Sequence, residues 1–162
     1  MAKIIIKSSE VLADLRSAGW LESEINPDSN LHRRHEAADI CEPDNVERVW
    51  RILGVCIAEV KMCLRSMLDL NACVCKSQND LLRPESWQLE FRCPTDRITL
   101  ELLKEKIHEF MVASVMADRM KVIMPEAAKP WTESASTSFS EIYGIAATSA
   151  QKHPVRRRMW PI

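Results

Sequence analysis

The sequence predicts a mainly α-helical bundle with a small β-hairpin and an extended C-terminal tail, and three observations support this fold class. The 162 residues include only three glycines, and a chain so poor in glycine has few sites for tight turns. Two long segments repeat apolar residues every three or four positions, which is the period of an amphipathic helix. A short segment, Trp87–Cys93, alternates apolar and polar residues instead, as a half-buried strand does. We therefore expect three to four helices around one core.

The N-terminal region starts with a short apolar run at residues 3–7, which we expect to form a strand. Ser8 or Ser9 can then cap a helix, because a serine oxygen accepts a hydrogen bond from a free backbone N–H of the first turn. Gly19 is expected to end that helix, since glycine is common just beyond the last helical residue. Residues 32–41 are expected to add one or two helical turns.

The clearest helical pattern is predicted to run from about residue 44 to residue 70. Asp44 is expected to be the N-cap, with Glu47 at the third helical position as in a capping box. The apolar residues of this segment recur at spacings of three and four: Val46, Val49, Trp50, Leu53, Ile57, Val60, Leu64, Met67 and Leu68.

The predicted hairpin spans about residues 72–93, with Ala72–Lys76 pairing with the alternating strand. The alternation places Trp87, Leu89, Phe91 and Cys93 on one face of that strand and Gln88, Glu90 and Arg92 on the other. Two strands alone are marginally stable in water, so the hairpin must pack on helices or on a neighbouring chain. Gln88 and Arg92 on its polar face are therefore candidate contacts between subunits.

Pro125 separates two further predicted helices, which cover residues 99–123 and 125–152. Proline interrupts the first of them and suits the first position of the second. Four methionines lie along the first of these helices or directly at its end: Met111, Met116, Met120 and Met124. They either fill the core or form a deformable apolar surface that contacts identical neighbours.

No linker divides the chain, so we expect one domain over residues 1–153 and an extended tail over residues 154–162. Pro154 and Pro161 prevent the tail from continuing a helix. The tail is either frayed in solvent, as many termini are, or it docks on another chain, because arginine and tryptophan are enriched at binding hot spots. The docking alternative makes six residues candidates for partner binding: Arg156, Arg157, Arg158, Met159, Trp160 and Ile162.

Composition and charge exclude several classes of protein. The net charge of −1 gives no overall attraction to nucleic acid or to an anionic membrane. No segment reaches the roughly 18 consecutive apolar residues of a membrane span, so we expect no membrane contact. The six cysteines are expected to be free thiols, because no export signal is present and Cys73-Val-Cys75 is not a C-x-x-C motif.

No motif for catalysis is present, and we expect neither an enzyme nor a cofactor. His32 and His35 share a face if they are helical, but no third metal ligand accompanies them, so we expect a solvated face and no metal site. His108 is expected to be a surface or half-buried hydrogen-bonding residue. Three glycines are too few for a phosphate-binding loop.

Five short segments carry a resemblance to a known family: Asp44–Trp50, Leu89–Pro94, Ile107–Val112, Pro125–Ala128 and Pro154–Arg158. With this order of elements, residues 44–162 resemble the head–tail adaptor (connector) proteins of long-tailed phages, of the type found in phages and prophages of Bacteroides. The resemblance rests on a pattern of elements and not on a catalytic signature.

The resemblance implies a structural virion protein that forms a ring of identical subunits between the portal and a neighbouring connector or tail protein. DNA would pass through the channel without sequence-specific binding. The protein would be found at the head–tail junction of the virion, and in the host cytoplasm during assembly. Two alternatives remain: another phage tail-completion or terminator protein, or a small cytosolic nucleic-acid-binding regulator, against which the near-zero net charge argues.

Overall fold

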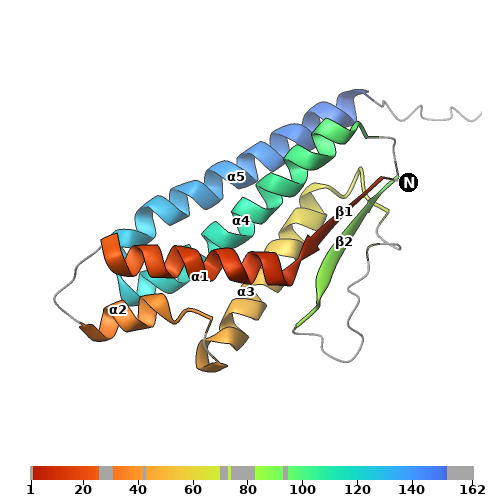
Figure 1. Cartoon of the computed structure of the whole chain (residues 1–162). Coiled ribbons are helices and arrows are strands. Elements are labelled where there is room, and N and C mark those ends of the chain that lie inside the picture. Colours follow the sequence, from red (N-terminus) through yellow and green to blue (C-terminus); the bar gives the residue numbers. More distant parts are fainter. Residues whose placement is uncertain are drawn as a thin grey trace, which may run out of the picture.

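The computed structural model describes residues 2–25, 31–41, 43–69, 73, 83–92 and 95–152, and it is mainly α-helical as predicted. A small antiparallel two-stranded sheet accompanies the helices, which also confirms the predicted fold class. In chain order the elements are β1 (Ala2–Lys7), α1 (Ser8–Ile25), α2 (Leu31–Ala38), α3 (Pro43–Cys63), β2 (Ser86–Phe91), α4 (Arg97–Ile123) and α5 (Pro125–Lys152), as Figure 1 shows.

Helix α4 is the centre of the bundle. It lies antiparallel to α5 along most of its length, while α1 and α3 cross it on its other sides (Figure 1). Asp96 caps its start, where the carboxylate accepts a hydrogen bond from the backbone N–H of Thr99 at 3.0 Å. Phe110 of α4 packs on Phe139 of α5 with ring centroids 5.0 Å apart. The predicted boundaries of both helices are confirmed to within two residues.

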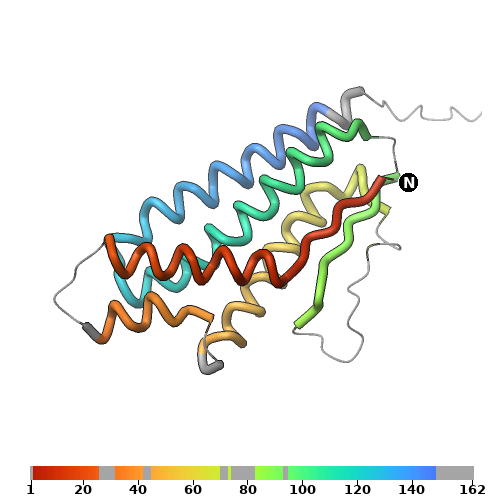
Figure 2. The backbone as a smooth tube through the Cα atoms, viewed as in Figure 1, coloured from red at the N-terminus to blue at the C-terminus, as the bar shows by residue number. Residues whose placement is uncertain are grey.

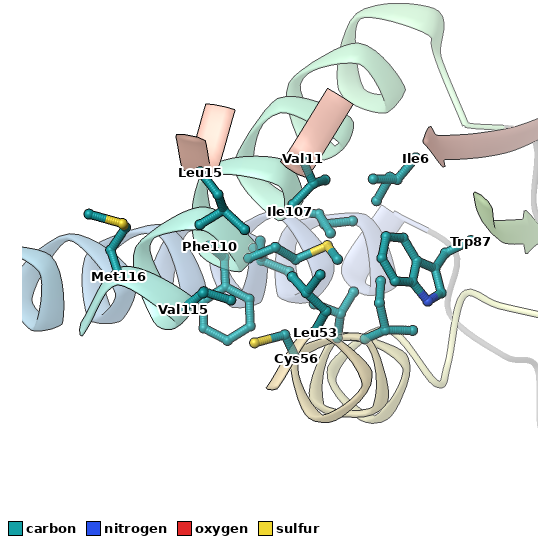
Figure 3. Packing of buried hydrophobic residues seen from close by; sticks show 14 of the residues in the cluster. Ile6, Val11, Leu15, Leu53, Cys56, Trp87, Ile107, Phe110, Val115 and Met116 are labelled. Atoms are coloured by element: carbon teal, nitrogen blue, oxygen red, sulfur yellow. The ribbon is translucent and has the colours of Figure 1, made fainter. Parts of the chain in front are cut away.

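One continuous core joins the sheet and the helices. Figure 3 shows Val11 and Leu15 of α1, Leu53 of α3, and Ile107 and Phe110 of α4 gathered around the same apolar interior. The four methionines discussed above also belong to this core: Met111, Met116, Met120 and Met124 are all buried. They therefore fill space within the chain and do not present a soft surface to neighbours.

The two-stranded sheet forms between residues far apart in the sequence. β1 pairs with β2 in antiparallel register, with Ile4 opposite Leu89 and Ile6 opposite Trp87, and the two strands lie side by side in Figure 2. The predicted partner of β2 within the hairpin is therefore replaced by the N-terminal strand. β1 is apolar, so it supplies backbone hydrogen bonds to β2 and also extends the apolar face that packs on the core. Residues 72 and 74–76 of the predicted first strand lie outside the described residues.

The other edge of β2 is met by the segment that follows α3. Asp69 donates its backbone N–H to the carbonyl of Glu90 at 2.9 Å, and Arg92 donates to the carbonyl of Met67 at 2.9 Å. Leu68 and Phe91 form an isolated bridge between these hydrogen bonds. The C-terminal half of β2 is thus paired on both edges.

The predicted alternation of β2 is confirmed where the structure describes it. Trp87, Leu89 and Phe91 are buried, whereas Gln88 and Glu90 are only half-buried. The ring of Trp87 lies 6.0 Å from that of Trp50 on α3, centroid to centroid. Cys93, predicted for the same face, lies outside the described residues.

Helix α1 passes through Gly19, so the prediction that this glycine ends the helix is wrong. The reason is a close approach of the next helix. A Cβ atom at this position would overlap the backbone oxygen of Ala37 in α2, and it would lie 3.0 Å from the Cδ1 atom of Ile40. Glycine therefore serves here to let two helices meet, not to end one.

Helix α3 starts at Pro43 and ends at Cys63, whereas the sequence pattern predicted residues 44–70. Asp44 consequently lies in the first helical turn and is not the N-cap, and proline suits that start. Leu64 and Leu68 are buried like the apolar residues of the helix. Their spacing continued the helical pattern past Cys63, although residues 64–69 leave the helix to meet β2. The turns predicted within residues 32–41 are confirmed by α2.

Candidate interaction surface

The six candidate residues of the tail lie outside the described residues: Arg156, Arg157, Arg158, Met159, Trp160 and Ile162. Their starting point, however, is defined, because α5 ends at Lys152. The end of α5 lies beside the start of α4, since the two helices are antiparallel (Figure 1). The last described residue before the tail, Lys152, is therefore close to the first turns of α4.

Gln88 and Arg92, the other candidate residues, differ in how exposed their side chains are. Gln88 is half-buried within the β1–β2 ladder, opposite Ile5. Arg92 lies just beyond β2 with an exposed side chain, and its Nη2 atom is 4.0 Å from the Oδ1 atom of Asp69. Arg92 is thus the more accessible of the two, and the predicted contact between subunits stays a prediction.

The histidines make local contacts in the described structure. His32 Nε2 lies 3.3 Å from the Oε1 atom of Glu36, one turn along α2. His108 Nε2 lies 2.7 Å from the Oδ2 atom of Asp14, which joins α4 to α1. No cluster of three or more potential metal ligands occurs among the described residues.

The cysteines that the structure describes are free thiols: Cys41, Cys56, Cys63 and Cys73. Burial raises the pKa of Cys56 to about 11 and outweighs its side-chain hydrogen bond with Ser114. Such a thiol is protonated at neutral pH and is a poor nucleophile. Cys75 and Cys93 lie outside the described residues.

The surface that sequence reasoning missed lies at the start of α4. Ile98 and Leu102 are one helical turn apart, and they are 78% and 42% exposed. Two hollows share Leu102 as a common wall. We call this region the α4 N-terminal surface and define it by Ile98, Glu101, Leu102, Glu105, Glu141 and Gly144.

The first hollow, of about 570 Å³, is open to solvent and lined by charged groups. They are the carboxylates of Glu10, Glu101 and Glu105 and the ammonium group of Lys104. Glu101 pairs with Arg97 at 2.7 Å, and Glu10 pairs with Lys7 at 3.2 Å. No ion pair of Glu105 is found among the described residues, so this carboxylate is available to a cationic partner.

The second hollow, of about 480 Å³, lies between α4 and α5 and reaches Thr148, one turn before the end of α5. The Lys106 ammonium bridges Glu109 at 2.9 Å and Glu141 at 3.0 Å. Hydrogen bonds to those two carboxylates raise the pKa of Lys106 to about 12. Gly144 lines the second hollow, and a Cβ atom added to it would meet no neighbour within 4 Å.

A sequence signal for this surface exists in retrospect. Leu103 and Ile107 follow the core stripe of α4, and both are fully buried. Ile98 and Leu102 form a second apolar pair, four residues apart, off that stripe. This exposed apolar pair, with charged residues around it, is the sequence feature that marks the surface.

Comparison of this chain with protein-family models, with curated proteins and with solved structures finds no match. None of the described helices is both long and apolar enough to cross a lipid bilayer.

Proposed function

We propose that this chain is a structural virion protein, a head–tail connector (adaptor) subunit that works by forming a ring of identical copies. The ring would lie between the portal and a neighbouring connector or tail protein, and DNA would pass through its channel without sequence-specific binding. The proposal rests first on the resemblance of residues 44–162 to connector proteins. It assigns no catalytic residue, metal or cofactor to the chain.

The observation that carries the proposal is the composition of the last ten residues beside a helical bundle. Among the described residues, the buried core runs from Ile4 to Ala146 and includes all five helices. The last ten residues include three arginines and Trp160, the residue types enriched at binding hot spots. A compact bundle with a short basic and aromatic extension suits a subunit that binds its neighbours in an assembly.

The buried methionines are not available for such contacts, because they belong to the core. Besides Ile98 and Leu102 at the start of α4, exposed apolar side chains lie on four helices. They are Trp20, Leu21 and Ile25 on α1, Val55 and Met62 on α3, Val122 on α4 and Tyr143 on α5. Portal and tail-side partners would use surfaces other than the one that joins identical copies.

Electron microscopy of the negatively stained protein, alone and mixed with the portal protein encoded by the same phage, tests this function. A connector is expected to form rings that stack coaxially on the portal. Rings that ignore the portal but bind tail tubes would favour a tail-completion or terminator protein. A monomer that binds duplex DNA with a steep salt dependence would favour the nucleic-acid-binding regulator.

A further inference from the structure

We propose that the C-terminal tail of one copy, residues 154–162, docks on the α4 N-terminal surface of a second copy. This inference rests on the proposed function, because it names the contact that would link identical subunits into a ring. The acceptor is the exposed pair Ile98 and Leu102 with the hollow on either side of it.

Apolar complementarity is the first argument. Ile98 and Leu102 leave a ridge of aliphatic surface in water, and burying it against a partner is favourable by roughly 25 cal/mol per Å². The hollows of about 570 and 480 Å³ fall within the roughly 300–1,000 Å³ of typical ligand pockets. Trp160, Met159 and Ile162 are the apolar side chains of the tail, and an indole is a preferred anchor for such a site.

Charge complementarity is the second argument. Of the three carboxylates that line the first hollow, Glu10 and Glu101 pair with Lys7 and Arg97. Glu105 is left without a described ion pair, and the tail presents three consecutive arginines. A guanidinium group binds a carboxylate through two parallel hydrogen bonds, which gives both energy and orientation. Glu105 is the best placed acceptor, because no described residue pairs with it and it lies one turn beyond Glu101 on α4.

Reach and direction favour a second copy over the tail's own bundle. Ten residues follow Lys152, and an extended chain of that length spans about 33 Å. The second hollow ends at Thr148, so a tail folding onto its own bundle must reverse direction. Proline is the only common turn residue that the tail contains, and Pro154 biases His153 toward an extended backbone.

The contact joins two different patches, the tail of one copy and the α4 N-terminal surface of the next. Such a heterologous contact repeats from copy to copy, and it closes into a ring when the rotation between copies allows it. Each subunit would then carry one used tail and one used surface. The arrangement also leaves the apolar side chains on α1 and α3 free for other partners.

The test uses two full-length variants that each lose one half of the contact. The surface variant combines Leu102→Ser with Glu105→Lys. The tail variant combines Arg156→Glu, Arg157→Glu and Arg158→Glu with Trp160→Ser. The matched control, Met62→Ser with Glu59→Lys, makes the same chemical changes on the exposed face of α3, where Met62 is 76% exposed.

Light scattering coupled to size-exclusion chromatography measures the mass of each protein over a range of concentrations. The wild type and the control are expected to assemble alike. Each of the other variants is expected to lose self-association by at least about thirtyfold, as expected when a hot-spot residue worth about 2 kcal/mol is removed. An equal mixture of the surface and tail variants is expected to form a 1:1 complex, because one intact tail then meets one intact surface.

The mixture decides between the alternatives. Two variants that stay monomeric when mixed would overturn the inference and indicate a tail bound to its own bundle or to solvent. If the control loses self-association to the same extent, the tail does not bind specifically at the α4 N-terminal surface, and the inference fails. If the surface and tail variants still form rings that bind the portal, the connector function stands and the inference fails. If the 1:1 complex forms but no wild-type ring binds the portal, the inference stands and the connector function fails.

Discussion

Gly19 sets the distance between α1 and α2. A methyl group at this position would overlap the Ala37 carbonyl oxygen, which belongs to backbone and cannot rotate away. The other two glycines, Gly54 and Gly144, have no neighbour within 4 Å of an added Cβ atom. The three glycines of the chain therefore differ in role although all of them lie within helices.

Gly19→Ala is expected to lower the free energy of unfolding by about 1–3 kcal/mol, because the added methyl overpacks the contact between the two helices. Gly54→Ala is the matched control and is expected to raise it by roughly 0.5–1 kcal/mol, since alanine suits a helix interior better than glycine. Chemical denaturation of both variants measures the difference. Equal stabilisation of the two variants would show that α2 does not approach α1 this closely.

Arg119 is the one buried residue of α4 with a formal charge among the described residues. Its Nε atom has no hydrogen-bond partner there. Burial, and then the nearby positive charge of Arg48, lower the pKa of Arg119. The negative charges of Asp118 and Glu36 act in the opposite direction, and the arginine contributes its aliphatic stem to packing.

Arg119→Met keeps most of that apolar stem and removes the charge, so we expect the melting temperature to stay the same or to rise. Arg119→Ala, which also removes the packing, is expected to lower it. Thermal unfolding followed by circular dichroism compares the two. A fall of several degrees for the methionine variant would show that the guanidinium group stabilises the fold.

At the scale of elements, β2 depends on both of its neighbours. β1 covers one edge, residues 67–69 meet the other, and the helices cover the face that carries Trp87, Leu89 and Phe91. Ser8, at the start of α1, donates its backbone N–H and its hydroxyl to the Glu85 carbonyl at 3.0 and 2.9 Å. The strand is therefore held by packing and by pairing over long sequence distances.

Phe91→Ala is expected to lower the free energy of unfolding by about 3–5 kcal/mol, as truncation of a large core side chain does. Phe91 is only 1% exposed, and it sits where β2 meets Leu68. Urea titration measures the change. A loss below about 1 kcal/mol would mean that the sheet adds little to the stability of the bundle.

Charge changes at Gln88 and Arg92 are expected to disturb assembly more than folding. Arg92→Glu exchanges an exposed cation for an anion and places it near Asp69, while Gln88→Glu adds a charge within the ladder. Melting temperature and ring formation are measured on the same samples. Normal rings from both variants would confine the role of this region to capping the core, with contacts between subunits elsewhere.

At the scale of the whole molecule, the described elements share one packed core. That core draws on β1, β2 and all five described helices. A single core of this kind unfolds as one cooperative unit. Assembly and folding are therefore expected to depend on different parts of the chain.

Deletion of residues 154–162 is expected to leave the melting temperature within about 2 °C and to abolish the assembly of identical copies into a ring. The deleted residues follow α5, which ends at Lys152, and the described elements already share one core. Thermal unfolding and light scattering coupled to size-exclusion chromatography measure the two effects. A truncated protein that melts several degrees lower and still assembles would show that the tail binds its own bundle.

The sequence alone determined the helical fold class, the boundaries of α4 and α5, and the buried face of β2. These features follow from local periodicity, because apolar residues spaced at 3.6 or at 2 positions can bury one face in only one type of element. The candidate tail also came from the sequence, since its composition needs no fold to be noticed. The acceptor surface could not be predicted from the sequence, because only the fold brings Ile98 and Leu102 close to Glu10 of α1 and Glu141 of α5.

Only the tertiary structure decided which strand pairs with β2, where α3 ends and why Gly19 lies within a helix. Each of these depends on a contact between segments distant in sequence: Ile6 with Trp87, Met67 with Arg92, and Gly19 with Ala37. Local propensity is nearly the same for a strand that pairs with residues 72–76 and for one that pairs with residues 2–7. The pairing partner of β2 is the strand that buries the most apolar surface and satisfies the backbone hydrogen bonds. Both contributions arise only in the folded bundle.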